Sequence, residues 1–221
     1  MATSYAAAGK QLDAILDDPQ ARTLVAKFYD RNGPFAGDTF DALNPNSPNS
    51  IDHVDLLAIT LLDVRVRPLA VRQLLEDRQT RSTLLSLLRR IPADVDLWDA
   101  ECRILDTASE VWTLLDKLPG IGPVIAGKLL ARKRPRLIPV VDSVTARALA
   151  APKGEVWNAI RECLADDSRL RTVRLLRPVD ISQHVVSDLR ILDSLLWMRY
   201  SESANARRVK RGLGYPGMER R

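Results

Sequence analysis

Hydrophobic and polar residues recur along most of the chain at the spacing of an α-helix. Apolar positions three and four residues apart mark 4–17 and 20–30 as two amphipathic helices, separated by Pro19. Similar patterns continue to residue 199 without a hairpin of strands, so we predict an all-α, multi-helical fold. The further helices that we predict span residues 51–63, 68–77, 80–90, 97–118, 123–133, 143–150, 153–165, 168–176 and 184–199.

The segment 31–50 interrupts these patterns. It is rich in Gly, Pro, Asn and Ser, which are the residues that favour turns and loops. Loops of this length are usually functional or cover part of the domain. We therefore predict a long surface loop, followed by a helix for which Ser50 supplies the N-cap.

Composition supports the helical prediction and indicates the cellular location that we expect for the protein. Apolar residues make up 46% of the chain, while aromatic residues, which strands concentrate, make up only 5%. No apolar run approaches the roughly 18 residues of a membrane span, and the N-terminus lacks the layout of a signal peptide. We therefore expect a cytoplasmic protein with no membrane partner. The oligomeric state stays open.

Positive charge is concentrated in two parts of the chain, which has a net charge of +5. Residues 117–150 hold seven cations against one anion, and residues 207–221 hold six against one, whereas residues 1–116 carry 12 cations and 18 anions. A mildly acidic body with a focused basic patch indicates a polyanion as partner. The second concentration lies in 201–221, which we predict to be a basic, mobile tail.

The stretch 118-LPGIG-122 stands between two predicted helices. One interpretation is a plain helix stop, in which Gly120 is left-handed and Pro123 opens the next helix. A second glycine, Gly122, also lets backbone N–H groups approach an anion at the positive end of that helix. We predict that Gly120, Gly122 and Val124 hold a phosphate oxygen through their N–H groups. Such a site recognises a nucleic-acid backbone and not its sequence.

The cations that follow this turn admit two interpretations. One is a solvated helix end, whose charges complement the helix dipole. The other is a track for a phosphate backbone, because the run continues past the helix and directly follows an anion-binding turn. We favour the second interpretation. The cations that we predict to contact DNA are Lys128, Arg132, Lys133, Arg134, Arg136 and Arg147.

Asp142 stands between an extended link, residues 134–141, and the predicted helix 143–150. This position suits an N-cap, whose carboxylate accepts hydrogen bonds from the first N–H groups of the helix. A carboxylate held in this way is also a candidate for catalysis. The two roles are compatible, because a cap fixes the geometry of the side chain.

Residues 115–126, in the pattern L-x-x-L-P-G-I-G-x-x-x-A, resemble the helix-hairpin-helix DNA-binding motif, which would occupy 107–133 here. Val141-Asp142-Ser143 and Arg147 are similar to the V-D-T-H-V-x-R run that follows the hairpin in the endonuclease III branch of the helix-hairpin-helix DNA glycosylases. The clear resemblance covers residues 115–147 only.

This resemblance implies a two-lobed helical bundle over residues 1–200 and duplex DNA as the partner. It also implies that Asp142 is the catalytic carboxylate, which stabilises an oxocarbenium-like sugar after the base is flipped out of the stack.

The departures from that family restrict the chemistry. Members that cleave the strand carry a nucleophilic lysine where this chain has Val124, so no lyase activity is expected. The histidine of the V-D-T-H run is replaced by Val144. The four-cysteine iron–sulfur loop cannot be built from Cys102 and Cys163 alone, so we expect no cofactor and no metal.

The chain as a whole resembles an uncharacterised bacterial family, DUF6308. The similarity rests on K-L-L-A-R-K-R-P-R-L-I-P-V-x-D-S-V at 128–144 and L-R-x-L-D-x-x-L-W-M at 189–198. Three hypotheses for the function follow. The first is DNA binding without catalysis, the second is a monofunctional DNA glycosylase, and the third is a helical module that binds another protein.

Overall fold

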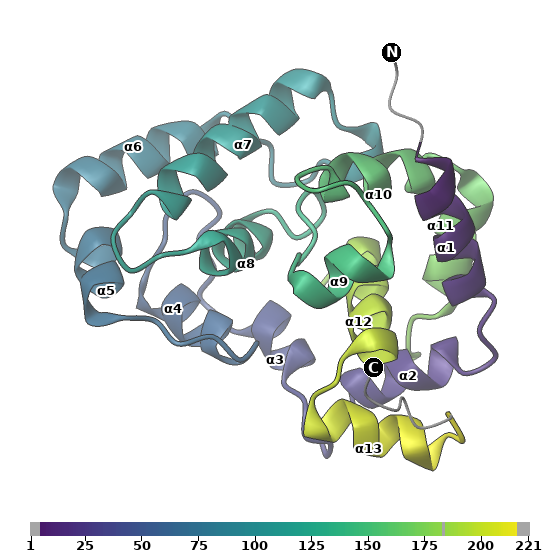
Figure 1. Cartoon of the computed structure of the whole chain (residues 1–221). Coiled ribbons are helices and arrows are strands. Elements are labelled where there is room, and N and C mark those ends of the chain that lie inside the picture. The colour runs from purple at the N-terminus through teal and green to yellow at the C-terminus, as the bar shows by residue number, and fades with distance from the viewer. Residues whose placement is uncertain (1–4, 183, 216–221) are drawn as a thin grey trace.

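The computed structural model describes residues 5–182 and 184–215, and every regular element among them is helical (Figure 1). This confirms the all-α prediction. None of these helices is long and apolar enough to cross a membrane. The elements are α1 (Ala6–Leu16), α2 (Ala21–Phe28), α3 (Gly37–Ala42), α4 (His53–Thr60), α5 (Pro68–Leu75), α6 (Arg78–Arg89), the 3-10 turn η1 (Leu97–Asp99), α7 (Cys102–Asp116), α8 (Pro123–Lys133), α9 (Ser143–Ala148), α10 (Val156–Leu164), α11 (Asp167–Leu175), α12 (Asp188–Tyr200) and α13 (Ala204–Gly212).

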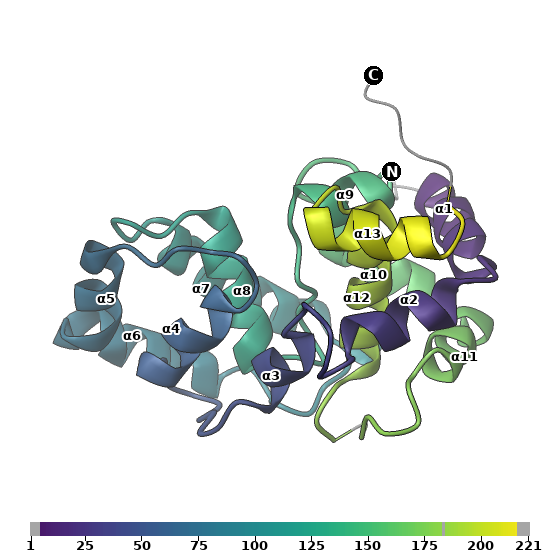
Figure 2. The same ribbon diagram turned by 90° about the horizontal axis from the view of Figure 1, so that it is seen from below.

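The helices form two lobes, which lie side by side in Figures 1 and 2. In the first lobe, α7 packs on α8 and α6, α4 packs on α8 and α3, and α5 packs on α6. In the second lobe, α12 packs on α2, α9, α11 and α13, while α1 packs on α10 and α11. The first and last helices of the chain therefore share the second lobe, and the first lobe is inserted between them.

The centre of the first lobe is α8. Every residue of this helix from Ala126 to Lys133 is buried. Three of them, Ala126, Gly127 and Ala131, are small and let neighbouring helices approach closely. A Cβ added at Gly127 would lie in ordinary van der Waals contact with Trp112 of α7, 3.8 Å from its Nε1, so the two helices pack against each other at this point.

Two helix boundaries differ from the predicted ones. The N-cap of α4 is Asp52 and not Ser50, because the Asp52 carboxylate accepts the Val54 N–H at 2.8 Å and forms a reciprocal capping box. The helix predicted over 97–118 divides into η1 and α7. Its backbone is extended at Ala100, whose carbonyl accepts a hydrogen bond from Arg161 at 2.8 Å. Such a tertiary contact overrides the local helical pattern.

The predicted tail also differs from expectation in its described part. Residues 204–212 form α13, which packs on α2 and α12. The Lys210 ammonium donates to the Ser201 carbonyl at 2.8 Å, and the Tyr215 hydroxyl donates to Asp18 at 2.7 Å. The packing of α13 and the bond from Tyr215 to Asp18, 197 residues away, hold a segment whose composition alone indicated mobility. The remainder of the predicted tail, 216–221, lies outside the described residues.

Candidate nucleic-acid interface

Most of the cations that we predicted to contact DNA are inside the protein. Lys128 is 6% exposed, Arg132 and Lys133 are 2% exposed, and Arg134 is 1% exposed. A phosphate backbone outside the protein cannot reach these groups without opening the fold. This corrects the prediction for these four residues.

Two of the buried cations satisfy the C-terminal ends of other helices. The Lys128 ammonium donates to the Leu62 carbonyl at 2.5 Å, just after α4. The Arg134 guanidinium donates to the carbonyls of Leu88 and Ile91 at the end of α6, the latter at 2.9 Å. The last carbonyls of a helix lack partners within it and carry partial negative charge, so a buried cation at that place is both hydrogen-bonded and neutralised.

The other two buried cations share one carboxylate. Asp55 of α4 has a fully buried side chain and lies 2.8 Å from Nε of Arg132 and 2.5 Å from Nζ of Lys133. Arg132 also donates to the carbonyls of Phe40 and Leu43 at the end of α3, at 2.5 and 2.6 Å. Charges buried at this depth are tolerated only when they are paired and hydrogen-bonded, as they are here. The cation run therefore fastens α3, α4 and α6 to α8.

Arg136 and Arg147 are exposed, yet neither of them lines the turn between α7 and α8. Arg136 makes two hydrogen bonds with Asp96, at 2.8 and 2.5 Å. Arg147 belongs to α9 in the second lobe, where its Nε donates to the Ser143 carbonyl at 3.0 Å. Of the predicted contact residues, only those of the turn itself are gathered in one place.

The turn between α7 and α8 has the predicted conformation. Gly120 has a φ of +85°, which is the left-handed region, and Gly122 is the N-cap of α8. No side chain caps this helix, and Pro123 occupies its first turn. In the described part of the chain, the N–H groups of Gly122, Val124 and Ile125 have no hydrogen-bond acceptor. They remain available to an anion.

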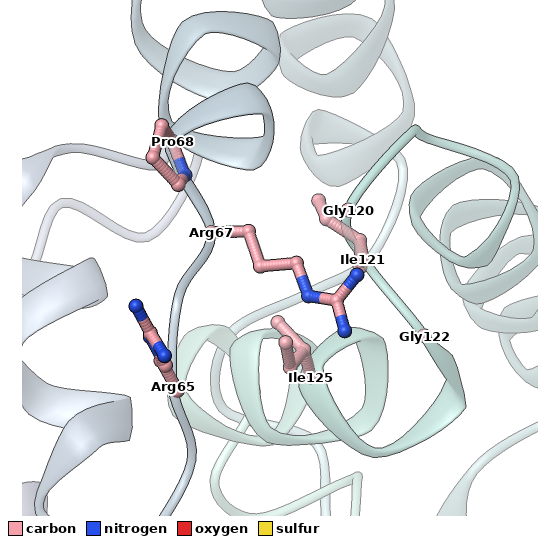
Figure 3. A pocket seen from close by; sticks show the side chains of 7 residues that line it. All are labelled: Arg65, Arg67, Pro68, Gly120, Ile121, Gly122 and Ile125. Carbon is pink, nitrogen blue, oxygen red and sulfur yellow. The ribbon is translucent and has the colours of Figure 1, made fainter.

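Beside this turn lies a cavity of about 770 Å³, shown in Figure 3. One wall comes from the loop between α4 and α5, and the other comes from the turn and the first residues of α8. The two walls are in close contact, since a Cβ added at Gly120 would lie 3.1 Å from the backbone nitrogen of Ala70. The lining residues are Arg65, Arg67, Pro68, Gly120, Ile121, Gly122 and Ile125.

The cations of this cavity are Arg65 and Arg67, which our reading of the sequence missed. Val64 and Val66 pack against the core, whereas Arg65 and Arg67 are exposed. Both arginines line the cavity, and Figure 3 shows the Arg67 side chain extending toward the turn while the Arg65 side chain lies on the other side of the loop. Neither arginine forms an ion pair with any described residue. The alternation V-R-V-R directly before Pro68 was the signal available in the sequence.

Asp142 is the N-cap of α9. Its Oδ1 accepts the N–H groups of Val144 and Thr145 at 2.8 and 2.9 Å, and the Thr145 hydroxyl accepts the Asp142 N–H at 2.9 Å. Its Oδ2 takes part in none of the hydrogen bonds among the described residues. Asp142 does not line the cavity at the turn. Burial lowers the pKa of Lys128, and the negative charge of Asp142 partly opposes that effect.

The link before Asp142 is held by α12. Arg190 donates to the Ile138 carbonyl, and the Asp193 carboxylate accepts the Val140 N–H at 2.8 Å. Arg190 and Asp193 also pair with each other at 2.7 Å and are both buried. Burial raises the pKa of Asp193 to about 6. The run 189–198, one of the two on which the resemblance to DUF6308 rests, thus has a structural role in positioning the extended link that leads to Asp142.

The fold and these contacts define an all-helical protein with a cation-lined turn. Residues 21–200 match a family of unknown function, DUF6308, and the chain belongs to that family. No curated protein and no solved structure matches the chain.

Proposed function

We propose that the protein binds DNA through the phosphate backbone, without sequence specificity, at the α7–α8 turn. In this proposal the N–H groups of Gly122 and Val124 hold one phosphate oxygen. Arg65 and Arg67 neutralise neighbouring phosphates, in place of the buried cations of α8.

The observation that carries the proposal is that two kinds of positively polarised group, each without a partner in the described part of the chain, line the same cavity. On one side are N–H groups at the positive end of α8, which have no acceptor among the described residues. On the other side are two exposed arginines without an ion-pair partner there. Among the residues that the structure describes, no acidic side chain lines the cavity. Main-chain N–H groups and guanidinium groups together are a typical set of phosphate ligands.

The resemblance of the turn to the helix-hairpin-helix motif supports DNA over other polyanions. That motif binds the backbone of a nucleic acid through the N–H groups of its glycine-containing turn. In this chain the N–H groups at the start of that element have no acceptor among the described residues.

The salt dependence of binding to a labelled DNA duplex, followed by fluorescence anisotropy, tests the proposal. The two phosphates neutralised by Arg65 and Arg67 should give a slope of log affinity against log salt of about −2, because each neutralised phosphate contributes about −0.9. Replacing Arg65 and Arg67 together with Ala should make the slope less steep by about 2.

Arg103→Ala is the matched control for this experiment. Arg103 has a side chain that is 80% exposed, and it lies near the start of α7, at the other end of that helix from the turn. The 15 residues of α7 extend over about 22 Å. Loss of this charge should leave the affinity unchanged. A duplex that does not bind at low salt, or that binds with a flat salt response, would favour a protein-binding module instead.

A second candidate function is the removal of a damaged base, with Asp142 as the catalytic carboxylate. One observation favours it. Only Oδ1 of Asp142 is used by the cap of α9, so Oδ2 is left for a developing positive charge on a sugar. Val124 stands where the strand-cleaving DNA glycosylases carry their nucleophilic lysine, so such an enzyme would be monofunctional.

Asp142→Asn tests this candidate cleanly, because Asn is as good an N-cap as Asp and should preserve α9. The measurement is alkali-dependent cleavage of duplexes that each carry one lesion. Activity in the native protein that is lost in Asp142→Asn, at equal thermal stability, supports catalysis. Activity that survives the substitution excludes Asp142 from the chemistry.

A further inference from the structure

We infer that the cavity beside the α7–α8 turn takes one unpaired nucleotide of a DNA strand, with its base against the apolar floor and its phosphate on the turn. This inference rests on the proposed function and extends it from the backbone to the class of DNA that is preferred. It predicts that single-stranded DNA binds better than a duplex.

The first argument is the apolar part of the lining. Besides the turn and the two arginines, the cavity is lined by the apolar side chains of Ile121, Ile125 and Pro68. A phosphate group is strongly hydrated and gains nothing from apolar surface, so a site for phosphate alone leaves this lining unexplained. The flat face of a base is the part of a nucleic acid that such a surface suits.

The second argument is the position of Arg67. Figure 3 shows its side chain extending from the loop before α5 across the cavity toward Ile121 and Ile125. A planar guanidinium stacks on the face of a base, and the opposite face then meets the isoleucine side chains. Arg65, two residues earlier, lines the same cavity and supplies a second cation for the next phosphate of the strand.

The third argument is size. The cavity of about 770 Å³ falls within the roughly 300–1,000 Å³ of small-molecule sites, which is far more than one phosphate requires. A base inside a duplex has both faces stacked and its edge paired, so it cannot enter. An unpaired nucleotide has a free face and can enter without that cost.

The experiment uses the full chain and three labelled DNAs of one length. These are a single strand of mixed sequence, the blunt duplex that it forms with its complement, and a single strand of abasic sugars with the same number of phosphates. Stacking contributes about 1–3 kcal/mol per base, so we expect the mixed strand to bind about 5- to 150-fold tighter than the abasic strand. We also expect it to bind tighter than the duplex.

Arg67→Lys separates stacking from charge, because it keeps the cation and removes the planar group. This variant should lose more affinity for the mixed strand than for the duplex, and so lose most of the preference for the strand, whereas Arg103→Lys should change neither affinity. Equal thermal unfolding midpoints show that both variants are folded.

The outcomes distinguish this inference from the proposed function. Equal binding of all three DNAs, or an equal loss on strand and duplex in Arg67→Lys, overturns the nucleotide site and leaves backbone binding intact. A duplex bound more tightly than the strand also overturns it. Absence of binding to any of the DNAs at low salt overturns both.

Discussion

Replacing Gly122 with Ala adds a single methyl group at the α7–α8 turn. A Cβ built on Gly122 meets no other atom within 4 Å, and the φ of −116° is ordinary for any L-amino acid. The methyl group therefore causes no clash and no backbone strain. Because Gly122 lines the cavity, we expect the methyl group to occupy the space of a phosphate oxygen bound to the turn.

The expected effect of Gly122→Ala on the free energy of unfolding is small, whereas its expected effect on the Kd for DNA is large. Ala is a poorer N-cap than Gly by up to about 1 kcal/mol, whereas removing a glycine from the unfolded chain stabilises by about 0.4–1 kcal/mol. The free energy of unfolding should therefore change by less than about 1 kcal/mol. A hydrogen bond to a charged oxygen is worth about 1.5–3 kcal/mol, so the loss of one should raise the Kd for DNA about 10- to 150-fold.

Fluorescence anisotropy at low salt measures the Kd, and urea unfolding measures stability. Gly120→Ala is the informative comparison, since its φ of +85° costs an L-residue about 1–2 kcal/mol and its Cβ would lie 3.1 Å from the Ala70 nitrogen. That variant should lose stability, whereas Gly122→Ala should lose affinity only. If Gly122→Ala binds DNA as tightly as the native protein, the turn does not hold a phosphate.

Three further predictions concern the buried charges and the cap. Asp55→Ala should lower the free energy of unfolding by about 3–5 kcal/mol in urea titrations, because it leaves two cations buried without their partner, whereas Arg136→Ala should cost less than about 1 kcal/mol. Asp142→Ala should cost about 1 kcal/mol more than Asp142→Asn in the same assay, and equal stability would show that the cap contributes nothing. Burial raises the pKa of Asp193 to about 6 and that of Asp41 to about 7. Each carboxyl therefore contributes stability that is fully present below about pH 4 and is lost as the pH rises through its raised pKa. The free energy of unfolding should fall by at most about 1.4 kcal/mol per pH unit for each carboxyl, and Asp193→Asn should make this fall shallower; a pH dependence unaltered by that variant would contradict the assignment.

Helix positions and the turn could be predicted because their signals are local. The glycine pair and Pro123 determine how α7 ends and α8 begins within a few residues, and the structure has α8 at the predicted bounds 123–133. Ser50 and Asp52 show the limit of such signals. Both are good caps, and the reciprocal bond with Asp55 selects the second.

The role of the cation run could not be predicted because its partners are distant in sequence. Arg132 meets Asp55 and Phe40, which precede it by 77 and 92 residues. Nothing near Arg132 in the sequence indicates that these acceptors surround it. Arg65 and Arg67 were missed for a different reason. Their alternation with valines was visible, but the turn that they face lies more than fifty residues later, as the cavity lining shows.

The placement of the first and last helices in one lobe has a consequence for synthesis on the ribosome. Tyr29 near the end of α2 donates to the carbonyl of Arg190, 161 residues later, so α2 cannot be covered until α12 has emerged. At about 5–20 residues per second, that interval is roughly 10 to 30 seconds. During this time the inserted lobe can fold, while the apolar faces of α1 and α2 stay accessible to chaperones or to neighbouring nascent chains. Completion of the protein therefore depends on a late closure between its earliest and its latest helices.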